Sequence, residues 1–142
     1  MSRLVSWVSR CLAPAILLIA AIGCGRGNPL GLVPVSGRVT LDGAPLADAT
    51  VSFIPEQGRP ASGTTNAEGR FELTTLDPGD GVMPGDHKVT VMKYADHDAE
   101  KNPYARLVSL VPVHYVELKT TPLTVSVPKS GDSNVEITLA KK

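Results

Sequence analysis

The side chains best suited to chemistry are three histidines, His87, His97 and His114, and none has the partners that a metal site or a catalytic triad requires. His97 lies between Asp96 and Asp98, but side chains of consecutive residues diverge, and a metal site needs three or four converging ligands. His87 falls on the inward parity of a predicted strand, where a packed imidazole is expected.

Other motifs that carry chemistry are equally sparse. The run Asp77-Pro78-Gly79-Asp80-Gly81 lacks the third acid and the closing Glu of an EF-hand loop, so we expect a plain turn. The sequence contains no Gly-x-Ser-x-Gly elbow, phosphate-binding glycine loop or His-Glu-x-x-His pair. We therefore expect no catalytic residue, no metal and no cofactor, and predict that the protein is not an enzyme.

Composition argues against a nucleic-acid-binding protein. The chain has 142 residues and balances 14 lysines and arginines against 14 aspartates and glutamates. A near-neutral chain lacks the basic footprint of a nucleic-acid-binding protein. Both cysteines, Cys11 and Cys24, precede residue 25, so no disulfide framework can form within the domain that follows.

Residues 1–23 predict a secretory signal peptide. Arg3 and Arg10 make the first ten residues basic, no acid offsets them, and residues 11–22 are apolar throughout. The apolar run is shorter than the ~20 residues that a transmembrane helix needs, and Pro14 weakens a spanning helix further. An uncleaved anchor is the minor alternative.

The segment Ala21-Ile22-Gly23-Cys24 resembles the lipobox of bacterial lipoproteins, with Ala21 where that pattern prefers Leu. The resemblance implies cleavage between Gly23 and Cys24, diacylglycerol on the Cys24 sulfur, and acylation of the new amine in many bacteria. Two or three acyl chains anchor a protein firmly. We expect an exported protein held by lipid at the periplasmic face or the cell surface, with residues 24–34 as a flexible tether. Ordinary cleavage beside an incidental cysteine is the alternative.

Residues 35–142 predict one all-β domain. Apolar and polar residues alternate between turn signals, and no helical period is evident. Parity places Phe53 and Phe71 in the core, and the Asn66–Gly69 turn requires a positive φ at Gly69. We expect a β-sandwich of about seven or eight strands. The predicted strands are residues 33–41, 49–53, 62–65, 71–75, 87–91, 111–118 (a short edge strand), 123–127 and 135–139.

Three segments resemble, in order, the signatures of carboxypeptidase-regulatory-like (transthyretin-like) domains. They are Val35–Leu46 with Ala49–Phe53, then Thr65–Phe71, then Pro84–Val91, where His87 replaces the usual aromatic residue. Residues 111–115 and 121–125 are similar to short lipoproteins of planctomycete bacteria. Over residues 33–140 the resemblance implies an immunoglobulin-like or prealbumin-like sandwich with an accessory, adhesive or structural role. The ending Thr138–Lys142 differs from the Tyr-Arg-Gly-Ser of the related hydroxyisourate hydrolases, so that activity is not implied.

The longest break in the strand pattern, residues 95–107, suggests where contacts are made. Long loops of compact domains often carry function, so we expect Tyr94, His97 and Tyr104 to contact a ligand or partner, with a solvated connecting loop as the alternative. The predicted function is that of a membrane-anchored, non-catalytic lipoprotein. Its partners would be membrane lipid, through acylated Cys24, and an envelope protein; a carbohydrate- or small-ligand-binding module is the alternative. Nucleic acid is not among the expected partners.

Overall fold

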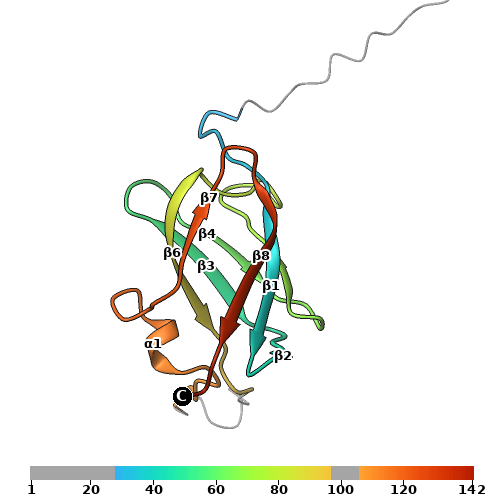
Figure 1. Ribbon diagram of the computed structural model, residues 1–142, viewed down its shortest axis with the longest axis vertical. Coiled ribbons are helices and arrows are strands. Elements are labelled where there is room, and N and C mark those ends of the chain that lie inside the picture. The colour runs from blue at the N-terminus through green and yellow to red at the C-terminus, as the bar shows by residue number, and fades with distance from the viewer. Residues whose placement is uncertain (1–27, 97–105) are drawn as a thin grey trace, which may run out of the picture.

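Two β-sheets packed face to face form the body of the protein in the computed structural model, which describes residues 28–96 and 106–142 (Figure 1). The first sheet contains β1 (Val35–Leu41), β2 (Ala44–Pro45), β5 (Arg70–Glu72) and β8 (Asp132–Leu139). The second contains β3 (Thr50–Pro55), β4 (Ala61–Thr64), β6 (Gly85–Met92) and β7 (Thr124–Val127). The prediction of an all-β, sandwich-like fold is thus confirmed.

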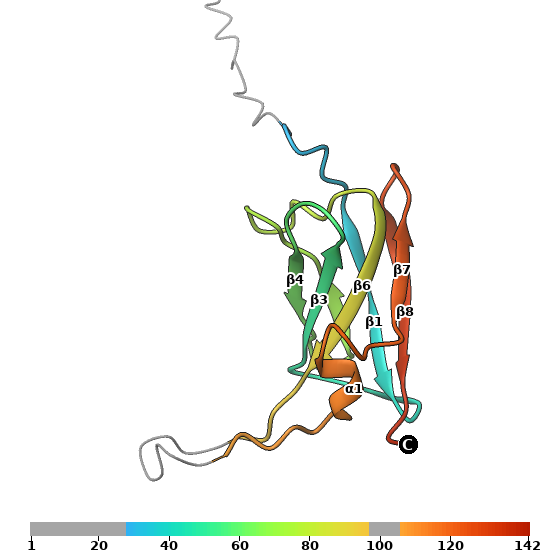
Figure 2. The same ribbon diagram turned by 90° about the vertical axis from the view of Figure 1, so that its left-hand side faces the viewer.

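Strand order brings two edges to one side of the molecule. In the first sheet β1 pairs antiparallel with β2 and β5 and parallel with β8. The second sheet has the antiparallel order β4-β3-β6-β7. Figure 2 shows β3 and β4 on the side opposite β7 and β8. The chain passes directly from the edge strand β7 of one sheet to β8 of the other, so both strands border the same opening between the sheets.

The core lies between the sheets and follows the predicted parity. Phe53 of the second sheet meets Phe71 of the first, with ring centroids 6.2 Å apart and planes tilted by 51°. Burying an apolar side chain of this size contributes roughly 1.5–3 kcal/mol to folding. The buried strand residues around these rings are Val35, Val39, Val51, Val89, Val91, Val127, Val135, Ile137 and Leu139.

Gly37 permits the close approach of three strands. A Cβ at this position would lie 2.9 Å from Phe71 Cζ and would collide with the carbonyl oxygen of Val135. Without that atom, the Phe71 ring can lie against the β1 backbone, and β8 can run beside it. The register of the β1–β8 ladder shifts between Val35 and Gly37, at the same place.

Two turns have the backbone geometry that their residue types favour. Asp42 and Gly43 take φ values of 50° and 82°, as a two-residue type I′ hairpin between β1 and β2 requires. In the second turn, the side-chain oxygen of Asn66 accepts hydrogen bonds from the Glu68 and Arg70 amides, both at 3.0 Å. Gly69 closes this turn with a φ of 76°.

The edge strand predicted at residues 111–118 is wrong, because this segment contains the short helix α1 (Val113–Val116). Pro112 precedes the helix, and its carbonyl accepts a hydrogen bond from the Tyr115 amide at 3.0 Å. Val111 and Tyr115 are both buried. Their spacing of four residues is compatible with one face of a helical turn and equally with one face of a strand. Burial of the Tyr115 ring decides between the two.

The Asn66–Gly69 turn provides a stability test. A Cβ at Gly69 would lie 2.5 Å from the carbonyl oxygen of Val39, so Gly69→Val combines a strained φ with a backbone clash. We expect a loss of about 2–4 kcal/mol in the free energy of unfolding, measured by urea denaturation.

The matched control is Gly43→Val, because Gly43 has a φ of 82° and nothing within 4 Å of its Cβ position. Strain alone should cost about 1–2 kcal/mol there. Equal losses in the two variants would contradict the close contact between the turn and β1.

Candidate functional site

Of the predicted site residues, the structure describes Tyr94. Gly23, Cys24, His97 and Tyr104 lie outside the described residues. Tyr94 is 40% exposed and follows β6 on a short two-stranded ribbon. In this ribbon Tyr94 pairs with Ser109, the Ala95 amide donates to Val108 O, and the Leu110 amide donates to Lys93 O, both at 2.8 Å.

Large apolar side chains gather at this end of the sandwich. Figure 1 and Figure 2 show the ribbon and α1 at the end of the molecule opposite to the segment that follows residue 28. We call these side chains the apolar end, and their exposures range from 40% to 64%. The apolar end comprises Tyr94, Leu107, Val108, Leu110 and Val113. The sequence pattern predicted a contact role for Tyr94, placed Leu107 in the polar break and Val113 in an edge strand, and gave no role to Val108 or Leu110, although the run Leu107-Val108 was a visible signal.

Side-chain hydrogen bonds to both sheets fix the segment around α1. The Tyr115 hydroxyl accepts a hydrogen bond from the Ala140 amide at 3.3 Å, just after β8. The buried Thr121 hydroxyl donates to the carbonyl oxygen of Val89 on β6 at 2.6 Å. Leu118 and Lys119, between these two attachments, are therefore held beside β6.

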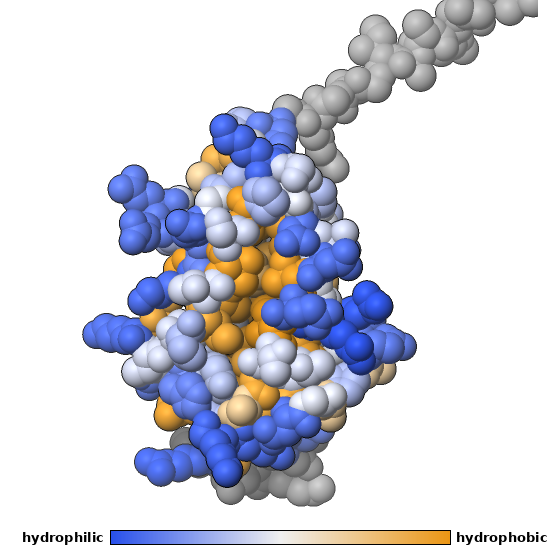
Figure 3. Space-filling view, in the orientation of Figure 1, coloured by the Kyte–Doolittle hydropathy of each residue, from blue (hydrophilic) through white to orange (hydrophobic). Residues whose placement is uncertain are grey.

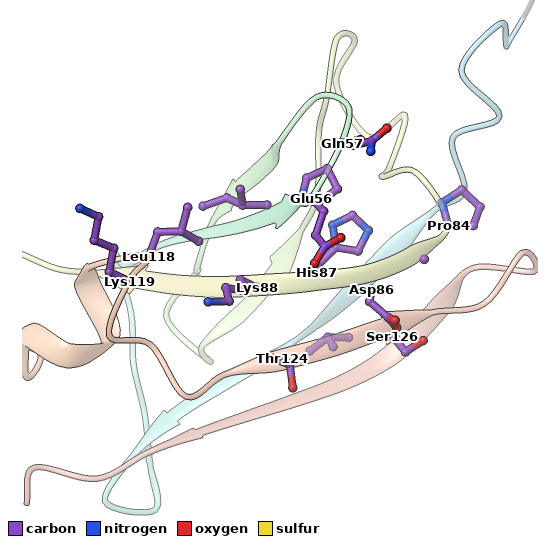
Figure 4. Close-up of a pocket in the computed structure, with 14 residues that line it drawn as sticks. Glu56, Gln57, Pro84, Asp86, His87, Lys88, Leu118, Lys119, Thr124 and Ser126 are labelled. Atoms are coloured by element: carbon purple, nitrogen blue, oxygen red, sulfur yellow. The ribbon is translucent and has the colours of Figure 1, made fainter.

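A concavity of about 1080 Å³ opens next to Leu118, on the outer face of β3, β6 and β7 (Figure 4). Strand pairing arranges its floor in rows. Ile54, Lys88 and Thr124 are neighbours across the three strands, and Asp86 pairs with Ser126 in the next outward-facing row. We call this concavity the β7 groove. Leu118 and Lys119 border one end of it, and Glu56, Gln57 and Pro84 border the other.

Charge is divided along the β7 groove. Figure 4 shows Lys88 and Lys119 toward the end near α1, whereas Asp86 lies toward the opposite end with Glu56. All four side chains are exposed to solvent. The groove can therefore receive a ligand that carries a negative and a positive group at different points along its length. Apart from the imidazole of His87, no aromatic ring lines it.

His87 is a core residue, as its parity predicts. It is 2% exposed, its ring centroid lies 5.9 Å from that of Phe53, and its Nε2 is 2.8 Å from the carbonyl oxygen of Met83. Its buried Nδ1 has no hydrogen-bond partner within the described residues. Contact with Phe53 and the Met83 carbonyl accounts for the position of this ring.

The Asp77–Gly81 segment is a self-satisfied turn rather than a calcium loop. The Asp80 carboxylate accepts hydrogen bonds from the amides of Thr75 at 2.7 Å, Leu76 at 2.9 Å and Asp77 at 2.8 Å. Burial raises the pKa of Asp80, but hydrogen bonds from the backbone together outweigh it and lower the pKa below its ordinary value.

The described part of the chain, residues 28–96 and 106–142, groups no three His, Cys, Asp or Glu side chains in a way that could hold a metal ion. Within the same ranges, no helix has the length and apolar character needed to cross a membrane.

No protein-family model matches the chain, and no curated protein matches it in sequence. The apolar end and the β7 groove are the candidate binding surfaces of the domain.

The Asp80 turn predicts a pH-dependent contribution to stability. Because the folded-state pKa is lowered, the ionised carboxylate stabilises the fold above the ordinary pKa of 3.8, and this contribution is lost as pH falls through the lower folded value. Asp80→Asn should reduce the free energy of unfolding by about 0.5–1 kcal/mol at pH 7, the range for an exposed capping side chain.

The measurement is urea denaturation of wild type and Asp80→Asn at pH 7 and at pH 3. The difference between the two proteins should shrink at the lower pH. Asp77→Asn is the matched control, because the structure gives the Asp77 side chain no hydrogen bond to a backbone amide within the described residues. A difference that persists unchanged at pH 3 contradicts the role of the Asp80 charge.

Proposed function

We propose that this protein is a non-catalytic lipoprotein of the bacterial cell envelope, anchored through acylated Cys24, and that its β-sandwich binds another envelope protein. The observation that carries the proposal is the apolar end, where Leu107, Val108, Leu110 and Val113 are each 44–64% exposed. A concentration of exposed apolar residues at one end of a domain is typical of protein–protein interaction sites.

The position of the apolar end supports this proposal. The described chain begins at residue 28, at the end of the sandwich opposite to the ribbon and α1 (Figure 1). Cys24 lies only four residues before that point in the sequence. An anchor there would hold the entry end of the domain near the lipid and direct the apolar end away from the membrane. A protein partner is then a better match for the apolar end than the lipid surface.

Chemistry favours a protein over a glycan as the partner. Glycan-binding platforms present exposed aromatic rings, and Tyr94 is the one aromatic residue of the apolar end. The remaining members are aliphatic. Aliphatic side chains gain free energy mainly by burial against other apolar groups, which a protein surface supplies and a sugar supplies poorly.

The anchor has a direct test. Cys24→Ser removes the sulfur that would carry diacylglycerol, so the protein should move from the membrane fraction to the soluble fraction of the exporting cell. Mass spectrometry of the wild-type N-terminal peptide should show a di- or triacylated cysteine. Cys11→Ser, a change within the proposed signal peptide, is the matched control and should leave fractionation unchanged. Retention of Cys24→Ser in the membrane fraction would exclude the lipid anchor proposed here.

The docking surface has a separate test in native membranes. A photo-crosslinking amino acid at Val113, which is 64% exposed, should give a reproducible protein adduct. The same probe at Leu76, which is 53% exposed and lies outside the apolar end, is the matched control and should give none. The double change Val108→Ser and Leu110→Ser should weaken the partner's affinity by about tenfold or more, because two buried apolar contacts are lost.

Three outcomes would contradict the docking surface. They are equal adducts at Val113 and Leu76, lipid adducts alone at Val113, and full retention of the adduct after the double change. Circular dichroism of the double variant should match that of wild type, because both residues are exposed and lie outside the core. A folded variant that loses the adduct thus reports on docking and not on stability.

A further inference from the structure

The edge strand β7 has main-chain groups that can accept a further strand. β7 ends the order β4-β3-β6-β7, and it pairs antiparallel with β6 through Lys88↔Thr124 and Asp86↔Ser126. The Val89 amide donates to the carbonyl oxygen of Leu123 at 2.9 Å. In an antiparallel ladder the residues that face the partner strand alternate. Leu123, Val125 and Val127 therefore direct their amides and carbonyls toward β6, and those of Thr124 and Ser126 point away from it.

The side chains of the same two residues face the β7 groove. Thr124 and Ser126 are exposed on the outer face of the sheet, in the rows of Lys88 and Asp86 respectively. Successive rows on one face of a strand are about 6.6 Å apart. An added strand would place the side chain opposite Thr124 in the row of Lys88, and the side chain two positions away, opposite Ser126, in the row of Asp86.

The other face of β7 offers apolar surface. Leu123 and Val125 are partly buried and pack against the core from the strand's inner face. Figure 3, in the orientation that has β7 and β8 in front, shows an apolar strip running along the molecule between polar side chains. Residues of an added strand that point inward would cover this strip and lose contact with water.

We propose that β7 binds an extended peptide segment of a partner protein by antiparallel strand addition, and that the β7 groove selects for a basic residue followed two positions later by an acidic one. Apolar residues occupy the intervening and flanking positions. In the antiparallel direction the basic residue lies opposite Ser126, in the row of Asp86, and the acidic residue lies opposite Thr124, in the row of Lys88. Ser126 and Thr124 lie between the ligand residues and these two charges, so long side chains such as Lys and Glu are needed to reach across β7. The pattern is apolar–basic–apolar–acidic–apolar, read from the amino end of the ligand.

The length of the ligand follows from β7 itself. Pro122 lies two positions before the first residue of β7, with Leu123 between them, and Pro128 directly follows the strand. Proline has no amide hydrogen to contribute to a ladder, so pairing is limited to the segment between these two residues. A ligand of about five residues spans that segment. This site lies away from the apolar end, so the proposal stands independently of the docking surface described above.

The experiment titrates the full-length protein, in detergent micelles, against two fluorescent peptides by anisotropy. One contains Val-Lys-Val-Glu-Val and the other Val-Glu-Val-Lys-Val, with identical polar ends. Titration extends to on the order of 1 mM, because a short added strand binds weakly. Wild type should prefer the first peptide by about five- to tenfold, the effect expected when two solvent-exposed charge pairs change from attraction to repulsion.

A charge-reversed variant supplies the decisive comparison. The double change Asp86→Lys and Lys88→Asp should invert the preference, so that the second peptide binds more tightly by a similar factor. Glu136→Lys, an exposed charge change on the edge strand β8 of the other sheet, is the matched control and should leave the preference of wild type unchanged. Equal binding of the two peptides to wild type would overturn the proposal, and so would a preference that the double change leaves in place.

Modified peptides test strand addition without changing the protein. N-methylation of the Lys and Glu residues removes the amides that would face Thr124 and Ser126, so binding should be lost. N-methylation of the central Val should have little effect, because its amide points away from β7. If no saturable binding occurs, or if both modified peptides bind alike, the ligand is not an added strand and the proposal fails.

Discussion

The packing of the two sheets depends on the contact between Phe53 and Phe71, which is possible because Gly37 has no side chain. Phe53 and Phe71 join the two sheets, and Phe71 can reach this position because Gly37 leaves room beneath β1. Gly37 also lets β8 run close to β1 in the parallel direction. Close packing of interiors makes such an arrangement intolerant of added atoms. β7, in the other sheet, is the strand that precedes β8 in the chain, so the chain crosses between the sheets just before β8.

A second constraint divides the outer face of the second sheet into a covered and an open half. Thr90 points outward from β6 yet is 4% exposed, because α1 and the segment after it lie against this strand. Tyr115 and Thr121 hold that segment by their hydroxyl groups. The covered half ends at Leu118 and Lys119, and the open half begins at Lys88. Packing that stabilises the domain at one end thus forms one wall of the β7 groove.

The alternation of apolar and polar residues, together with the turn residues, predicted several features of the fold correctly. The strand residues of the core, the positive φ of Gly69 and the burial of His87 followed from parity and from turn residues. The helix at Val113–Val116 did not, because a short apolar run satisfies both periods and tertiary burial of Tyr115 decides between them. The apolar end was partly visible in the sequence, in Tyr94 and the run Leu107-Val108, whereas the β7 groove was not. The β7 groove exists only once β3, β6 and β7 are paired, and exposure of Val113 depends on how α1 is docked.

An exposed edge strand can pair with other chains and cause aggregation, as well as bind a ligand. The features of β7 that limit aggregation also set the properties of the proposed site. β7 has four residues, and Pro122 and Pro128 prevent a longer ladder. Opposite charges on the groove disfavour apolar strands that lack matching groups. So short a ladder gives modest affinity, and the proposed anchoring of this protein, with its partner at the same membrane, would compensate by raising their effective concentration. Weak, selective strand addition would therefore suit reversible contacts between two proteins held at one membrane, as proposed above.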